Sequence, residues 1–208
     1  PSLPPQRNAQ PQSPELEGSG WVFQSLFAPH YALFTDGAGL IVLNLKAAWA
    51  RVVCETLEGK SPQSPEPVGS QPLLVPEHLS LSATQVEVLE GIQPFLTRNG
   101  WVIEPFGKGF FRILAQPAWL EEAAGRSLLE ALLAECPREA FHAKREVLLQ
   151  SELAGLVAQF RLREVQTPEA VAKLVKQLFQ CRQPLTCPKG RPTYFYLAPQ
   201  DIRARLRD

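Results

Sequence analysis

Two spacings of apolar residues alternate along this chain. Between Trp21 and Asn44 the apolar and aromatic residues form three short runs, WVFQSLFA, YALFT and LIVLN, and Asp36-Gly37-Ala38-Gly39 separates the last two. Short apolar runs bounded by turn residues are typical of strands. From Leu45 to Glu58 the spacing becomes helical. The pattern therefore predicts three strands, the last two forming a hairpin, that lead directly into a helix.

A second block follows the Pro- and Ser-rich segment Lys60–Ser70. Ser82 and Gln85 match an S-x-x-Q capping box, and Asn99-Gly100 is typical of a helix end. We expect a compact α+β unit here, inserted between the first segment and the remainder. Its predicted elements are a strand around His78–Leu81, the helix beginning at Ser82, a hairpin over 101–116, and two helices over 120–135 and 138–160, separated by the helix-breaking Pro137.

The C-terminal part begins with a strong helix start. Thr167, Pro168 and Glu169 supply a cap, a proline in the first turn and a first-turn acid, and the helix is predicted to reach about Gln180. A strand over Tyr194–Leu197 and a short basic helix over Asp201–Arg207 should follow. At the other end of the chain, Pro1–Gly20 has almost no apolar residues, which indicates a disordered linker.

Composition limits the classes of function. The 208 residues carry 21 basic and 21 acidic side chains, so no net field draws the chain to nucleic acid or to a membrane surface. The four cysteines have no CxxC spacing, which favours reduced thiols, and no apolar run is long enough for a membrane span. We expect a cytoplasmic protein. Since the chain begins at a proline and contains no methionine, we also expect a fragment of a longer protein.

The segment CPKGRPT is the most distinctive stretch. Its two prolines fix the backbone, while its glycine permits a conformation that a side chain would forbid, so a stiff and sharply shaped loop is predicted. The heptad resembles the CPHGRPT loop of the MutL family of DNA mismatch-repair proteins, with lysine in place of the family's histidine. The residues that carry this resemblance are Cys187, Pro188, Gly190, Arg191, Pro192 and Thr193.

The resemblance implies an architecture. The order of the predicted elements is similar to the C-terminal dimerisation region of MutL proteins, an α+β fold. In that region a split dimerisation subdomain, an antiparallel sheet with helices, is interrupted by a smaller α/β external (regulatory) subdomain. For this chain it implies a dimerisation subdomain over 21–68 and 150–208, and an external subdomain over 69–149.

The resemblance also bears on metal chemistry. In nuclease-bearing members a DQHAxxERxxYE pattern and the CPHGRPT loop together hold divalent metal, and the matching run here is NLKAAWARVVCE. Asn44 places an amide where the pattern has an aspartate, and Lys46 and Lys189 place cations where it has histidines. Metal binding needs electron-rich ligands, which these side chains do not supply. We therefore expect neither nuclease activity nor a metal or other cofactor in this fragment. The positions of the degenerate metal site are Asn44, Lys46, Ala50, Glu55, Cys187 and Lys189.

Two hypotheses address the lysines of this site. Lys46 and Lys189 could take the place of metal, neutralising Glu55 or capping a helix terminus. The alternative is simple solvated surface. The competing function is a degenerate metal-dependent endonuclease that uses Cys187, Glu55 and a further ligand.

The segment QPLLVP resembles the QxxLxP-type peptide by which MutL proteins engage the replication sliding clamp. Gln71, Leu74 and Pro76 would be its anchors, with Leu73 beside them, because an extended apolar pair can insert into a groove. The alternative is that Leu73 and Val75 simply begin a strand.

Partners follow from the same resemblance. The strands over 21–44 and the helix over 171–178 carry more apolar surface than one small sheet needs, which suits a buried homodimer face or, alternatively, an extended core. Sliding clamp, MutS and downstream repair proteins are expected partners in the bacterial nucleoid, and the family's ATPase would lie in an absent N-terminal domain. A subunit that works only as half of a heterodimer is a further alternative. Weak DNA contact, or else a solvated surface, is expected at the C-terminal basic residues Arg182, Lys189, Arg191, Arg203, Arg205 and Arg207.

Overall fold

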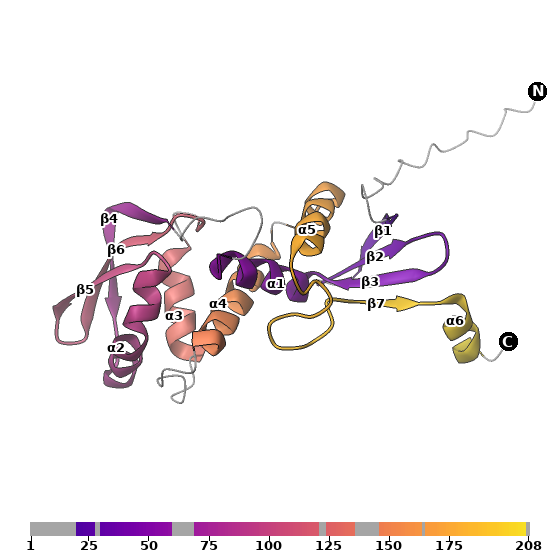
Figure 1. Ribbon diagram of the computed structural model, residues 1–208. Helices are drawn as coiled ribbons and strands as arrows, with labels where there is room; N and C mark the ends of the chain where they lie inside the picture. The colour runs from indigo at the N-terminus through magenta and orange to yellow at the C-terminus, as the bar shows by residue number, and fades with distance from the viewer. Residues whose placement is uncertain are drawn as a thin grey trace, which may run out of the picture.

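The structure is a computed structural model that describes residues 20–27, 30–59, 69–120, 124–135, 146–163 and 165–206. These residues form an elongated molecule with an antiparallel sheet toward each end and helices between them (Figure 1). The predicted α+β class with antiparallel sheets is confirmed. The split into subdomains at 68 and 150 stays a prediction.

One sheet contains the three strands predicted at the start of the chain. They are β1 (Val22–Phe27), β2 (Tyr31–Thr35) and β3 (Leu40–Asn44), and they pair antiparallel in that order. Asp36 forms the predicted turn between β2 and β3, since its Oδ1 accepts hydrogen bonds from the amides of Ala38 and Gly39 at 3.0 and 2.9 Å. The fourth strand, β7 (Tyr194–Leu197), pairs with β3. Strands from opposite ends of the described chain therefore share this sheet.

Among the residues that the structure describes, one face of this sheet is covered by other elements. The alternating side chains of Phe23, Ala32, Phe34, Ile41 and Leu43 are buried. Helix α5 (Pro168–Gln180) begins at the predicted Thr167 cap and buries four apolar residues of its own: Val171, Leu174, Val175 and Leu178. Aromatic contacts join the sheet to this helix, because the Trp21 ring lies 5.3 Å from Phe34 and 5.2 Å from Phe179.

The centre of the molecule is a helix pair. Helix α1 (Leu45–Leu57) starts where β3 ends, and Asn44 caps it by accepting a hydrogen bond from the Ala47 amide at 3.0 Å. It packs on α4 (Glu146–Arg161) and lies deep in the molecule, with most of its residues buried (Figure 1). The predicted change from strand to helix at Leu45 is confirmed.

The other sheet has the order β4-β6-β5. Its strands are β4 (Ser70–Ser80), β5 (Val102–Gly107) and β6 (Phe110–Pro117), and two helices, α2 (Ala83–Arg98) and α3 (Gly125–Glu135), accompany them. The capping box predicted at Ser82 and Gln85 is present. Leu79, Ile92, Trp101, Ile113 and Leu129 are among the almost fully buried side chains of this part.

Several boundaries differ from the sequence expectation. The strand expected around His78 already begins at Ser70, because its first residues pair with the end of β6. The helix expected from 120 begins at Gly125, and the final helix, α6 (Pro199–Leu206), begins before Asp201. The predicted linker up to residue 19 and the predicted helix start over 138–145 lie outside the described residues. No helix in the described part of the chain is long and apolar enough to cross a bilayer.

Candidate functional site

The CPKGRPT segment forms a closed loop, as predicted. The Cys187 amide donates to the Arg191 carbonyl at 2.8 Å, the Gly190 amide donates to the Cys187 carbonyl at 2.9 Å, and Thr186 bridges to Pro192. Gly190 has a φ of 75°, a left-handed conformation that a residue with a side chain rarely adopts. The loop therefore owes its shape to its own sequence.

Thr193 joins this loop to the sheet. Its side chain is fully buried, its hydroxyl donates to the Pro184 carbonyl, and its amide donates to the Leu185 carbonyl at 3.0 Å. Its own carbonyl accepts a hydrogen bond of 2.8 Å from the amide of Asn44, the cap of α1. The end of the loop and the start of α1 are thus fixed to each other.

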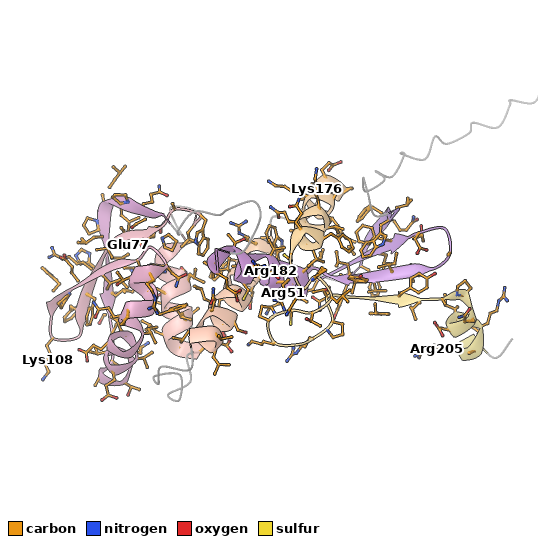
Figure 2. All side chains as sticks on the ribbon, in the orientation of Figure 1. Arg51, Glu77, Lys108, Lys176, Arg182 and Arg205 are labelled. Carbon is orange, nitrogen blue, oxygen red and sulfur yellow. The ribbon has the colours of Figure 1, made fainter. Side chains whose placement is uncertain are left out.

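Arg51 and Glu55 of α1 hold the segment that precedes the loop. Arg51 Nε donates to the Thr186 carbonyl at 2.6 Å, while the Glu55 carboxylate accepts from the amides of Arg182 at 2.7 Å and Gln183 at 3.2 Å. Figure 2 places Arg51 and Arg182 together in the middle of the molecule. Because the Glu55 carboxylate is buried and used in this way, its role in the structure is to position the chain.

A pocket lies between α1, α4 and the CPKGRPT loop. Its volume is about 190 Å³, and it brings together five of the six positions that the sequence assigned to a degenerate metal site: Asn44, Lys46, Ala50, Cys187 and Lys189. Glu55 is not part of its wall. Its other lining residues are Ala47, Glu135, Ser151, Gly155, Leu156, Gln159, Pro188 and Arg191.

The two lysines do not neutralise Glu55, so that hypothesis is corrected. Lys46 Nζ donates to Gln159 Oε1 at 3.1 Å, and Lys189 Nζ forms an ion pair with Glu152 at 2.9 Å. Both partners are on α4, which faces the loop across the pocket, whereas Glu55 is directed to the 182–183 backbone and to Arg51. Lys189 is exposed and both contacts are solvent-accessible, so the two lysines are surface residues that each have a defined partner.

The lining of this pocket does not fit a divalent metal ion. Such an ion requires several deprotonated, electron-rich donors that converge on one point. Here Asn44 Oδ1 is already bonded to the Ala47 amide, and two of the matching positions are ammonium groups. Within the described ranges, no three His, Cys, Asp or Glu side chains are grouped so that they could hold a metal.

Residues of α4 are the part of the pocket that sequence reasoning missed. Ser151, Gly155 and Gln159 of the lining follow one another at a helical spacing of four residues, which places them on one face. This spacing was visible in the sequence. What it did not indicate is that this face is opposite the CPKGRPT loop, since that depends on how α4 packs on α1.

The QPLLVP segment is a protrusion on an edge strand. Pro72 pairs with Ala115 and Glu77 pairs with Ile113, so the intervening residues of β4 bulge out opposite a single residue of β6. Leu74 is 97% exposed and Val75 is 76% exposed. Leu73 packs partly against the core, and Gln71 and Pro76 are half-buried. Leu74 and Val75 are thus the most accessible apolar residues of the segment, and the anchor role of Gln71, Leu73, Leu74 and Pro76 stays a prediction.

Two further thiols are buried, Cys54 on α1 and Cys181 at the end of α5. Burial raises the pKa of Cys54 to about 12, helped by the neighbouring Glu58 carboxylate. Burial likewise raises the pKa of Cys181 to about 12, with a smaller contribution from Glu55. Both thiols are free and are protonated at neutral pH, which makes them poor nucleophiles.

Comparison with known proteins agrees with this geometry. The family model described as the MutL C terminal dimerisation domain matches residues 24–164. The chain belongs to this family. It is 38% identical over 190 residues to the DNA mismatch repair protein MutL of Opitutus terrae, covering 90% of this chain and 30% of that protein.

Two other MutL proteins are also similar. The protein of Akkermansia muciniphila is 28% identical over 90% of this chain and 29% of its own length, and that of Desulforudis audaxviator is 31% identical over 93% of this chain and 33% of its own length. The chain thus spans about a third of the length of these relatives.

Proposed function

We propose that this chain is the homodimerisation domain of a DNA mismatch-repair protein. It acts as a matchmaker that couples mismatch recognition, made by MutS, to downstream repair proteins, and it has no nuclease activity of its own. The single observation that carries dimerisation is the uncovered face of the β1-β2-β3-β7 sheet. We call this surface the outer face.

Every strand contributes apolar side chains to the outer face, and Ser25 and Thr35 are polar positions on it. In the register of the sheet, Val42 is paired with Leu33 on one side and with Phe195 on the other. Phe27 is 59% exposed and Phe195 is 50% exposed. A contiguous apolar surface of this kind marks an interaction site. In a dimer with twofold symmetry, the outer faces of the two copies would cover each other. The apolar side chains of the outer face are Phe27, Tyr31, Leu33, Leu40, Val42, Phe195 and Leu197.

Helix α6 supports the same proposal. None of its residues is buried, and Ile202 and Leu206 are exposed. An isolated helix of this length is marginal in water, so its stability depends on a packing partner. It follows directly on β7 and extends beyond the sheet (Figure 1). A second copy on the outer face would be in place to cover it.

The test of dimerisation is analytical ultracentrifugation of the chain at micromolar concentration. Wild type should sediment as a dimer, and Val42→Glu as a monomer, because the charge would be buried at the centre of the outer face. Leu74→Glu, which places the same charge on a distant exposed leucine, is the matched control and should remain dimeric. A monomeric wild type would contradict the homodimer and favour a subunit that needs a different partner.

The proposal that nuclease activity is absent rests on the pocket. Lys46 and Lys189 place cations where the family pattern has metal donors, and Asn44 Oδ1 is used as a helix cap. Supercoiled plasmid incubated with the chain and Mn²⁺ should remain intact. Nicking that requires Mn²⁺ and disappears in Cys187→Ala would favour the degenerate endonuclease instead.

A second role, sliding-clamp binding, is favoured by the β4 bulge. Leu74 and Val75 protrude from an edge strand with almost no contact to the rest of the chain. An apolar pair presented on extended backbone suits insertion into a groove, and the neighbouring prolines lower the cost of ordering it. Repair of replication errors would place the full-length protein with its partners on the bacterial nucleoid.

A further inference from the structure

We propose that the pocket between α1, α4 and the CPKGRPT loop binds a phosphate group. Lys46, Lys189 and Arg191 all line it. They come from two separate segments, the start of α1 and the loop, and the fold brings them to one concave surface. Three cations around a cavity form a local positive site on a chain whose formal net charge is zero.

The acidic side chains near the pocket do not cancel the charge of its three cations. Glu152 is used by Lys189, and Glu135 is the acidic residue in the pocket wall. Lys46 has a neutral partner, the amide oxygen of Gln159, so its charge is not compensated there. No residue in the described part of the chain forms an ion pair with Arg191. Among the described residues, Lys46 and Arg191 are thus not paired with a carboxylate, and Glu135 is the one carboxylate in the pocket wall.

The start of α1 adds to this field. Asn44, Lys46 and Ala47 belong to its first turn, and all three line the pocket. The first turn contains no acidic side chain. The Asn44 side chain caps the Ala47 amide, but no carboxylate of the first turn opposes the helix dipole, whose field beside the Lys46 ammonium group favours an anion.

The size of the pocket limits the ligand. Sites for drug-sized molecules are clefts of roughly 300 to 1,000 Å³. At about 190 Å³ the pocket admits a single phosphate group with some water, and not a whole nucleotide. The remainder of a larger ligand would lie outside, beside the exposed Arg191. Inorganic phosphate and the phosphodiester backbone of DNA share this chemistry and are distinguished by the test.

The experiment is an NMR titration of the isotope-labelled 208-residue chain at constant ionic strength. One arm uses inorganic phosphate, and the other uses a short single-stranded oligonucleotide. We expect saturable shifts of the Lys46, Gly155 and Gly190 amides with phosphate, and with the oligonucleotide if DNA is the source. Shifts that do not saturate, or that occur only at the Arg203 and Arg205 amides of α6, would overturn the proposal.

Variants distinguish binding in the pocket from nonspecific attraction of phosphate to basic residues elsewhere. Lys46→Gln and Arg191→Gln should each weaken phosphate binding about tenfold, as expected for loss of a charge-assisted contact. Lys176→Gln removes an equal charge from α5, away from the pocket (Figure 2), and should bind as wild type does. Gly155→Leu should block binding sterically while leaving every charge in place, because a side chain there extends into open space. Equal weakening by Lys176→Gln, or unchanged binding in Gly155→Leu, would contradict the assignment.

Discussion

Arg51 and Glu55 lie one turn apart on α1 and form a buried ion pair, with 3.7 Å between Arg51 Nη1 and Glu55 Oε1. Both side chains also hydrogen-bond to the backbone that leads into the CPKGRPT loop, at Arg182, Gln183 and Thr186. The position of the loop relative to α1 therefore depends on this pair.

Removing the carboxylate should destabilise the fold strongly. Glu55→Ala leaves the Arg51 charge buried without its partner and two amides unbonded, and we expect a loss of about 3–5 kcal/mol in the free energy of unfolding. Glu55→Gln keeps the shape and should cost less, about 1–3 kcal/mol. Urea unfolding followed by circular dichroism measures both. In the matched control, Glu130→Ala breaks the exposed pair with Arg126 and should leave stability unchanged. A Glu55→Ala variant as stable as this control would contradict the role of the ion pair.

The buried thiols should make the fold sensitive to alkali. The pKa values of Cys54 and Cys181 are raised to about 12 from 9.0. Above pH 9 the unfolded chain therefore releases these protons while the folded chain retains them. The contribution of these two thiols to the stability of the folded state is complete below about pH 9 and is lost as the pH rises toward 12. Between about pH 8 and about pH 10.5, wild type should lose more of its unfolding free energy than the double variant Cys54→Ala/Cys181→Ala. Parallel losses in the two proteins would show that other groups cause the effect.

Gly155 offers a stabilising substitution. It lies inside α4, and an added Cβ would have no atom within 4 Å. Gly155→Ala should therefore raise the free energy of unfolding by about 1 kcal/mol, because glycine is disfavoured inside helices. Gly39→Ala is the matched opposite case, since its Cβ would clash with the Tyr196 ring and approach the Leu197 carbonyl at 2.7 Å. Thermal unfolding should rank the variants in the order Gly155→Ala, wild type, Gly39→Ala, and any other order would be contrary to the packing around these glycines.

The β4 bulge can be tested as a clamp-binding element without disturbing the fold. Leu74→Ala should lower affinity for a bacterial sliding clamp about tenfold, as expected when an interface anchor is truncated. Its stability should not change, because the side chain is 97% exposed. Leu185→Ala, at a leucine that is 60% exposed near the loop, is the control and should bind normally. Surface plasmon resonance with immobilised clamp gives both affinities. Clamp binding that is indifferent to Leu74 would place the contact elsewhere.

Local signals in the sequence were sufficient for most elements. The switch at Leu45, the Ser82–Gln85 capping box and the Thr167 cap each depend on residues a few positions apart, and each helix begins where they predict. The CPKGRPT loop was foreseen for the same reason. Its prolines and glycine restrict the backbone irrespective of their surroundings.

Features that depend on distant residues were not predictable. The Glu55 carboxylate accepts a hydrogen bond from the backbone amide of Arg182, which is 127 positions along the chain. The periodicity of apolar residues does not indicate such a contact. The bulge in β4 exists because its two ends pair with β6, although the segment itself reads as an ordinary strand. The pocket wall on α4 likewise required knowledge of which helix packs on α1.

The pairing of β3 with β7 has a consequence for biosynthesis. During translation β1, β2 and β3 leave the ribosome well before Tyr194–Leu197, with all the other strands and five helices of the described chain made in between. Until then the free edge of β3 exposes unpaired backbone groups, which are prone to pair with other chains. Completion of this sheet therefore waits until α5 and the CPKGRPT loop have been made, and a ribosome stalled before Tyr194 would release a fragment with an open, aggregation-prone edge.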